Sequence, residues 1–173
     1  MGGEKVKKLF LLFSLVFPVM LFAGGENTSS AYWSNDFRKA RLRARETGKN
    51  LFLLFTISDG DYHNKRAIQQ LRYSSILLKD GGEDFVFLHI DCPRNKKQSL
   101  ELAAQNKRLK NRFGVSFFPA IVLVSPTSPW GGLLYRYNGV PASTGEFLQE
   151  VRKKIKRPKP RPKSPETKNT VNP

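Results

Sequence analysis

The sequence predicts an α/β fold built on a central mixed sheet that is flanked by helices. Three short apolar runs, residues 51–57, 85–90 and 120–124, have the length and composition of buried strands. Stretches with apolar residues at helical spacing lie between and after these runs. This alternation is typical of an α/β domain, which we expect over residues 33–156 of the 173-residue chain.

The first predicted helix follows Trp33 and covers about residues 35–47, with Gly48 as its expected stop. One face of this helix is apolar and carries Phe37, Ala40 and Ala44. Its other positions include four arginines, Arg38, Arg41, Arg43 and Arg45. The arginines form either a basic binding face or an ordinary solvated helix surface.

The strand at 51–57 leads into the stretch that carries the first candidate site. Ser58-Asp59-Gly60 breaks the strand, and a helix is expected from about Asp61, with an inner face of Ala67, Ile68 and Leu71. A strand, a sharp turn and a helix N-terminus often hold a reactive group. The helix dipole and the free N–H groups stabilise negative charge there.

The remaining elements follow from the same patterns. Residues 73–79 are helix or loop, residues 80–83 form a turn, and Asp91-Cys92-Pro93 ends the second strand. A helix at 99–111 has three candidate buried positions, Leu102, Ala103 and Leu109. After a turn-rich connection at 125–132, a strand at 133–137 alternates poorly and could be buried on both faces. A capping box at Ser143 and Glu146 opens the last helix, whose inner face is Phe147, Leu148, Val151 and Ile155.

The central stretch resembles the active-site segment of bacterial thioredoxin-like proteins of the disulfide-isomerase-related type, F-T-x-S-D-W-C-x-x-C-K. The matching residues are Phe55, Thr56, Ser58 and Asp59. Gly60 stands where that motif has tryptophan, and Asp61 and Asn64 stand where it has its two cysteines. The resemblance therefore covers the frame of the site and not its reactive groups.

A second segment resembles the same family. Gly114, Val115 and Pro119 match the pattern G-V-x-x-x-P that precedes a strand in the thioredoxin fold, and the element order matches that fold over residues 33–156. The resemblance implies a thioredoxin-like fold with a cis proline at Pro119 beside the active-site helix. It also implies a peptide-binding cleft between these two segments, contributed by Gly60, Tyr62, His63, Phe117, Phe118 and Pro119.

Dithiol–disulfide exchange is excluded because it needs one thiolate to attack and a second thiol to resolve the mixed disulfide. The chain has a single cysteine, Cys92, which leaves the second strand and is the one catalytic candidate. Asp61 is expected to act as a helix N-cap. The spacing of Asp59, Asp61 and His63 fits no strong metal motif, His89 is expected to be a strand residue with one hydrogen bond, and we predict no metal or cofactor.

The N-terminus resembles a secretory signal over residues 1–24, followed by a linker over 25–32. Lys5, Lys7 and Lys8 precede an apolar run at 9–23, and small residues follow at a possible cleavage point. The run is short for a stable transmembrane span, although an uncleaved anchor stays open. The expected location is the bacterial periplasm or the exterior, where one cysteine could form no internal disulfide.

The formal net charge is +16, and about half of it lies in residues 152–173. Residues 157–173 are rich in lysine, arginine and proline, which predicts a disordered cationic tail. An anionic envelope component could bind between Lys153 and Lys163, whereas export argues against nucleic acid. The tail could also be merely solubilising.

Three hypotheses about function remain. The first is an exported thioredoxin-fold protein without dithiol chemistry that binds extended or unfolded protein segments, as a chaperone or a complex subunit. The second is a thiol–disulfide oxidoreductase or isomerase that uses Cys92 alone. The third is an envelope-binding protein that acts through its cationic tail.

Overall fold

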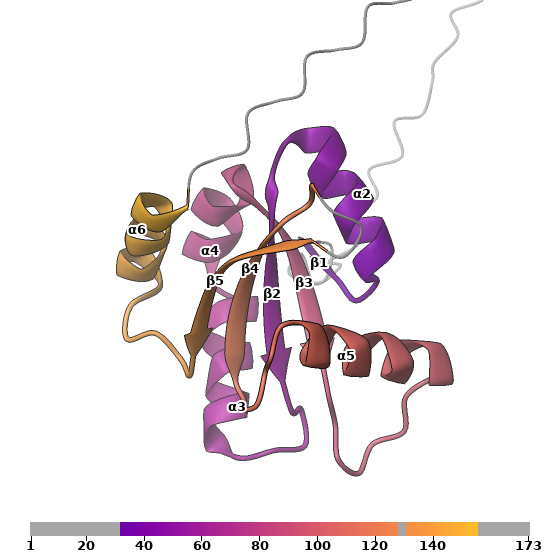
Figure 1. The fold of residues 1–173 in the computed structure, drawn as a ribbon. Coiled ribbons are helices and arrows are strands. Elements are labelled where there is room, and N and C mark those ends of the chain that lie inside the picture. Colours follow the sequence, from indigo (N-terminus) through magenta and orange to yellow (C-terminus); the bar gives the residue numbers. More distant parts are fainter. Residues whose placement is uncertain (1–31, 128–130, 156–173) are drawn as a thin grey trace, which may run out of the picture.

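The computed structural model describes residues 32–127 and 131–155, and its sheet confirms the predicted fold class (Figure 1). Five strands lie in the order β1-β3-β2-β4-β5. Parallel pairing joins β1 (Trp33–Ser34), β3 (Phe85–Asp91) and β2 (Asn50–Thr56). Antiparallel pairing adds β4 (Ala120–Ser125) and β5 (Gly132–Asn138). The predicted signal at 1–24 and tail at 157–173 lie outside the described residues.

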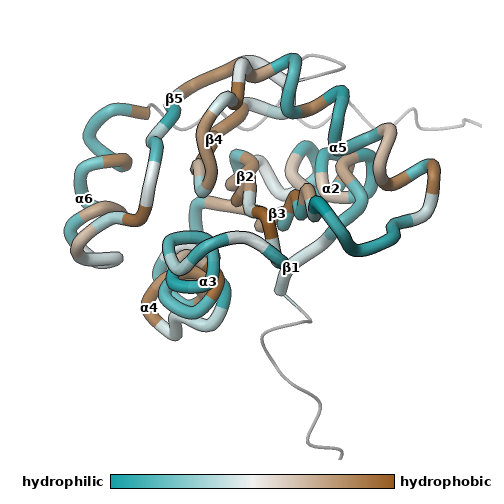
Figure 2. The backbone as a smooth tube through the Cα atoms, turned by 90° about the horizontal axis from the view of Figure 1, so that it is seen from below, coloured by the Kyte–Doolittle hydropathy of each residue, from teal (hydrophilic) through white to brown (hydrophobic). Residues whose placement is uncertain are grey.

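Helices cover both faces of this sheet, as the end-on view in Figure 2 shows. One face packs against α2 (Phe37–Thr47) and α5 (Leu100–Arg112). The other face packs against α3 (Tyr62–Ala67), a π-helical turn η1 (Ile68–Arg72), α4 (Ser75–Asp80) and α6 (Thr144–Lys154). A short 3₁₀ turn, η2 (Gly81–Glu83), connects α4 to β3.

Strand β2 is the centre of both apolar layers. It lies between β3 and β4, and all seven of its residues are buried. Leu51, Leu53 and Phe55 point to the face of α2 and α5, whereas Phe52 and Leu54 point to the opposite face. Successive side chains of a strand point to opposite faces, so a strand covered on both sides has to be continuously apolar.

The helix ends follow the sequence signals closely. The side chains of Asp36, Ser99 and Ser143 each accept a hydrogen bond from a backbone N–H in the first turn of α2, α5 and α6. Gly48 ends α2 with a φ of 68°, a conformation that costs other residues steric strain. The predicted inner faces of α2 and α6 are buried as expected.

Three predictions about packing are wrong. The strand at 133–137 is not buried on both faces, because β5 is an edge strand with one neighbour and leaves Leu133 and Leu134 exposed. Ala103 is exposed, because α5 turns Asn106 and Leu109 to the interior instead. Ile68 is only half-buried. Strand β1 was missed because two residues carry no detectable periodicity.

No helix within residues 32–127 and 131–155 has the length and apolar character needed to span a membrane.

We expect Phe52 to contribute more than any other side chain to the stability of the apolar layer between the sheet and α3, α4 and α6. It is fully buried, and its ring meets those of Trp33, Phe85, Phe87 and Phe147 at centroid distances of 5.6–6.4 Å. Phe52→Ala should lower the free energy of unfolding, measured in urea, by about 3–5 kcal/mol. Leu133→Ala, at a position that is 54% exposed, should change it by no more than about 0.5 kcal/mol. Equal effects of the two variants would contradict this packing.

Candidate functional site

The candidate site begins at the tight turn between β2 and α3. The N–H of Gly60 donates to the carbonyl oxygen of Ile57 at 2.8 Å. A Cβ on Gly60 would lie 2.8 Å from the same oxygen, closer than real Cβ atoms come. This turn therefore selects glycine at the position where the resembled motif has tryptophan.

Asp61 and Asn64, at the positions of the two cysteines, are joined by hydrogen bonds. One carboxylate oxygen of Asp61 accepts from the backbone N–H of Asn64 at 3.1 Å and from its side-chain amide at 3.0 Å. The amide oxygen of Asn64 accepts from the N–H of Ile57 at 2.9 Å, and Asn64 is only 2% exposed. Asp61 is thus the predicted N-cap, and the amide of Asn64 holds the pKa of Asp61 below its ordinary 3.8.

Asp59 and His63 do not join Asp61 in a metal site. The carboxylate of Asp59 accepts from the backbone N–H groups of residues 94, 95 and 96, and these bonds lower its pKa. Asp59 therefore anchors the loop after β3. His63 is exposed and contacts the ring of Tyr62 edge-on. Within the part of the chain that the structure describes, no group of three potential ligand side chains could hold a metal ion.

The proline segment lies next to this turn, as the resemblance implies. The Phe118–Pro119 peptide bond is cis. In the antiparallel register of β2 and β4, Phe55 pairs with Ala120, which puts Pro119 beside Thr56 at the end of β2. Pro119 is buried, Phe118 is half-buried, and Gly60 is half-buried. Tyr62 and Phe117 are 68% and 70% exposed, so the predicted peptide-binding residues supply two large exposed aromatic rings.

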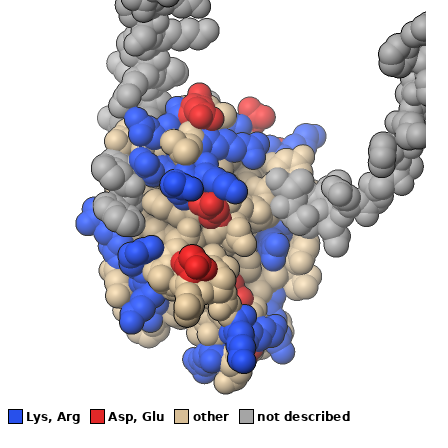
Figure 3. All heavy atoms as spheres, turned by 90° about the vertical axis from the view of Figure 1, so that its right-hand side faces the viewer, with Lys and Arg blue, Asp and Glu red and all other residues tan. Residues whose placement is uncertain are grey.

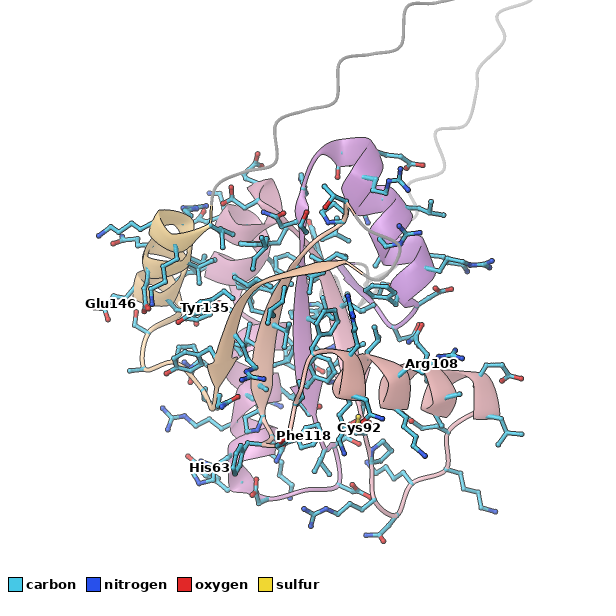
Figure 4. All side chains as sticks on the ribbon, viewed as in Figure 1. His63, Cys92, Arg108, Phe118, Tyr135 and Glu146 are labelled. Carbon is cyan, nitrogen blue, oxygen red and sulfur yellow. The ribbon has the colours of Figure 1, made fainter. Side chains whose placement is uncertain are left out.

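Cys92 lies at the same end of the sheet, because β2 and β3 are parallel (Figure 4). Its backbone N–H donates to the carbonyl oxygen of Thr56, and its side chain is half-buried against the apolar layer under α2 and α5. Burial, followed by the negative charge of Asp91, raises the pKa of the thiol to about 11. The positive charge of Lys110 opposes this shift. At neutral pH the thiol is protonated and is a weak nucleophile.

Two arginines of α2, Arg38 and Arg41, border a groove of about 710 Å³ between α2 and α5. Phe37, Leu102 and Leu109 supply apolar lining, and Arg38, Arg41 and Arg108 supply positive charge. Figure 3 shows Lys and Arg side chains at many places on this side of the molecule with acidic ones among them, and Asp36 and Glu101 also line the groove.

Sequence reasoning missed a polar cluster beside the predicted site. The hydroxyl of Thr56 lies 2.8 Å from Nε2 of His89, and Arg72 reaches Nδ1 of the same ring at 3.5 Å. His89 thus has two polar contacts and not the single one predicted. Asp91 accepts from the N–H of Ser58 at 2.8 Å. The sequence pattern that could have predicted this cluster is the presence of polar residues at the end of each of the neighbouring parallel strands.

Comparisons with known proteins agree with this architecture. No protein-family model matches the chain. The thioredoxin-related protein DsbJ of Chlamydia pneumoniae is 24% identical over 115 residues, which are 66% of this chain and 33% of that protein. The match therefore spans about a third of this curated relative.

Two solved structures share the fold. One is the DsbH oxidoreductase, with a TM-score of 0.63 and 20% identity, covering 88% of this chain and 93% of that one. The other is a thioredoxin from Thermus thermophilus, with a TM-score of 0.53 and 16% identity, covering 70% and 84%. Sheet order, helices on both faces and a cis proline after α5 define the chain as a thioredoxin-fold protein.

Within that class, the predicted resemblance to bacterial thioredoxin-like proteins of the disulfide-isomerase-related type is confirmed. The chain itself has one cysteine, Cys92, and no cysteine pair at the turn between β2 and α3.

Asn64 should be worth more to stability than an exposed asparagine. Asn64→Ala leaves the buried N–H of Ile57 without its acceptor, so the free energy of unfolding should fall by about 1–3 kcal/mol in urea titrations. Asn111→Ala, at an exposed position of α5, should change it by no more than about 0.5 kcal/mol. Equal losses in the two variants would mean that the Asn64 amide does not hold this turn.

The reactivity of Cys92 should rise steeply with pH. With a thiol pKa of about 11, the alkylation rate by iodoacetamide should increase about tenfold per pH unit between about pH 7 and pH 10. Lys110→Gln should slow the reaction at each pH, because it removes the cation that lowers the pKa. Lys107→Gln, at an exposed position of the same helix, is the matched control. An inflection at or below the ordinary thiol value of 9.0 would contradict the burial of this group.

Proposed function

We propose that this chain is a thioredoxin-fold binding module that holds extended or unfolded protein segments and carries out no dithiol chemistry. The observation that carries the proposal is the hydrogen-bonded pair of Asp61 and Asn64 at the positions of the redox cysteines. A carboxylate and an amide keep the turn and the helix start in place, and neither group can form or break a disulfide.

The surface beside this pair supports a role in peptide binding. Tyr62 and Phe117 are large, mostly exposed aromatic side chains, the kind of residue that anchors protein contacts. The hydrogen bonds found among the described residues include none from the backbone N–H groups of Phe117 and Phe118. Such N–H groups next to a strand can pair with an added extended chain.

The alternative, an oxidoreductase or isomerase that uses Cys92 alone, has weaker support. Nucleophilic attack on a disulfide needs a thiolate, and the half-buried Cys92 has a pKa of about 11. Release from a mixed disulfide would need a second thiol from elsewhere, since the chain has one cysteine. DsbH is described as an oxidoreductase, and that likeness shows the fold alone.

The proposed location is the bacterial periplasm or the exterior, which rests on the predicted signal at 1–24. Binding of an anionic envelope component between Lys153 and Lys163 also stays a prediction. Both segments lie wholly or mainly outside the described residues.

The proposal is tested by the precipitation of insulin during reduction by dithiothreitol, followed by turbidity. The protein should delay precipitation, because it holds the released chains, and Cys92→Ser should delay it equally. Tyr62→Ala and Phe117→Ala should each weaken binding about tenfold, as expected for aromatic anchors, and should shorten the delay at a given concentration.

Leu134→Ala is the matched control, because Leu134 is an exposed apolar residue on β5, away from α3. It should leave the delay unchanged. Faster precipitation that is lost in Cys92→Ser would support the single-cysteine enzyme and overturn the proposal. If Leu134→Ala shortened the delay as much as Phe117→Ala, the protein would hold insulin chains through its general surface hydrophobicity. That result would contradict a specific role of Phe117.

A further inference from the structure

A cavity of about 450 Å³ lies at the sheet edge formed by β1, beyond the carboxyl ends of three parallel strands. Its lining includes Ser34 from β1, His89 and Asp91 from β3, and Ser58 after β2. Arg72 of η1, Trp33 of β1 and the polar residues Asn35, Gln98 and Asn106 also line it, and we call this cavity the edge pocket. In open α/β sheets, ligands bind outside the carboxyl ends of parallel strands, in pockets of roughly 300–1,000 Å³.

Three residues that line the edge pocket each carry a buried polar atom without a hydrogen-bond partner among the described residues. These atoms are Nε1 of Trp33, Oγ of Ser58 and Nε of Arg72. Trp33 is only 7% exposed, so its indole N–H has little access to bulk solvent. Buried polar groups in folded proteins are nearly always paired, so three such atoms from residues that line one cavity point to a bound group.

The hydrogen-bond network around the pocket sets the polarity of that group. Arg72 only donates, so Nδ1 of His89 accepts, and Nε2 carries the hydrogen that is donated to the hydroxyl of Thr56. The Thr56 hydroxyl lies 3.5 Å from the Asp91 carboxylate, and the N–H of Ser58 donates to the same oxygen. His89 stays neutral near pH 7, because burial and Arg72 lower its pKa to about 4.

The charged groups that face the pocket are therefore Arg72 and Asp91. Two of the three unpartnered atoms, on Trp33 and Arg72, can only donate, and the Ser58 hydroxyl can donate as well. A matching ligand has to bring acceptor oxygens, and Arg72 favours a negative charge on them. One Asp91 oxygen is already occupied by the Ser58 N–H, which reduces its repulsion of such a ligand.

We propose that the edge pocket binds a small oxyanion, of the size of a carboxylate or phosphate group, with Arg72 as its counter-ion and Trp33 and Ser58 as donors. The pocket is separate from the surface formed by Tyr62 and Phe117, so this inference does not depend on the proposed function.

The test follows the indole N–H resonances in ¹H–¹⁵N spectra of the protein. The chain has 2 tryptophans, and Trp130→Phe assigns the Trp33 signal. Sodium acetate and sodium phosphate are titrated separately at constant ionic strength, with sodium chloride as the reference. The Trp33 signal should shift and saturate with a Kd of about 1 mM or tighter for at least one of the two oxyanions. The anion with the lower Kd shows whether the pocket prefers a carboxylate or a phosphate group.

Arg72→Gln should weaken this binding about tenfold or more, because a charged donor is lost. Arg66→Gln is the matched control, since Arg66 is exposed on α3 and pairs with Gln70. Ser58→Ala gives a second measure, because it removes one donor and keeps the backbone N–H that holds Asp91. A Trp33 signal that neither oxyanion moves beyond chloride, or equal weakening by Arg66→Gln, would overturn the proposal.

Discussion

The candidate site depends on one buried amide, that of Asn64, which fixes the passage from β2 into α3. Its oxygen accepts the N–H of Ile57, and its nitrogen donates to Asp61, so one side chain links the end of the strand to the cap of the helix. In a cysteine pair, the corresponding link is covalent and depends on the redox state. Here the link is made of hydrogen bonds, so the geometry of the turn is independent of thiol oxidants and reductants.

Both carboxylates of the turn accept hydrogen bonds that hold the local structure. Asp59 binds three backbone N–H groups of the loop after β3, and Asp61 binds the first turn of α3. Both interactions lower the pKa of the group, so both carboxylates stay ionised near neutral pH. A general acid or base works best with a pKa near the operating pH, which neither group has. The electrostatics of the turn thus give neither carboxylate a pKa suited to acid–base catalysis near neutral pH.

Most strands and helix ends of the fold could be predicted from local signals in the sequence. Burial on both faces makes β2 continuously apolar, and short polar side chains mark the N-caps of the helices. The resemblance located Asp61, Asn64 and the cis proline. Polar residues in the interior could not be predicted. Asn106 is buried because its amide donates to the carbonyl oxygen of Asp91, a residue 15 positions away. The edge pocket joins Trp33, Ser58 and Arg72 from three separate elements, and no sequence spacing brings them together.

The separation of core and site explains how the fold can be kept while its chemistry changes. The two apolar layers on either side of β2 contain none of Asp61, Tyr62, His63 or Phe117. Of the two positions where the resembled motif has cysteines, Asp61 lies outside both apolar layers, whereas Asn64 is buried and its amide links the strand to the helix through hydrogen bonds. Because core and site are separate, similarity of fold does not establish similarity of activity. A TM-score of 0.63 to an oxidoreductase measures the layers and shows the fold alone, whereas dithiol exchange needs two thiols and this chain has one cysteine.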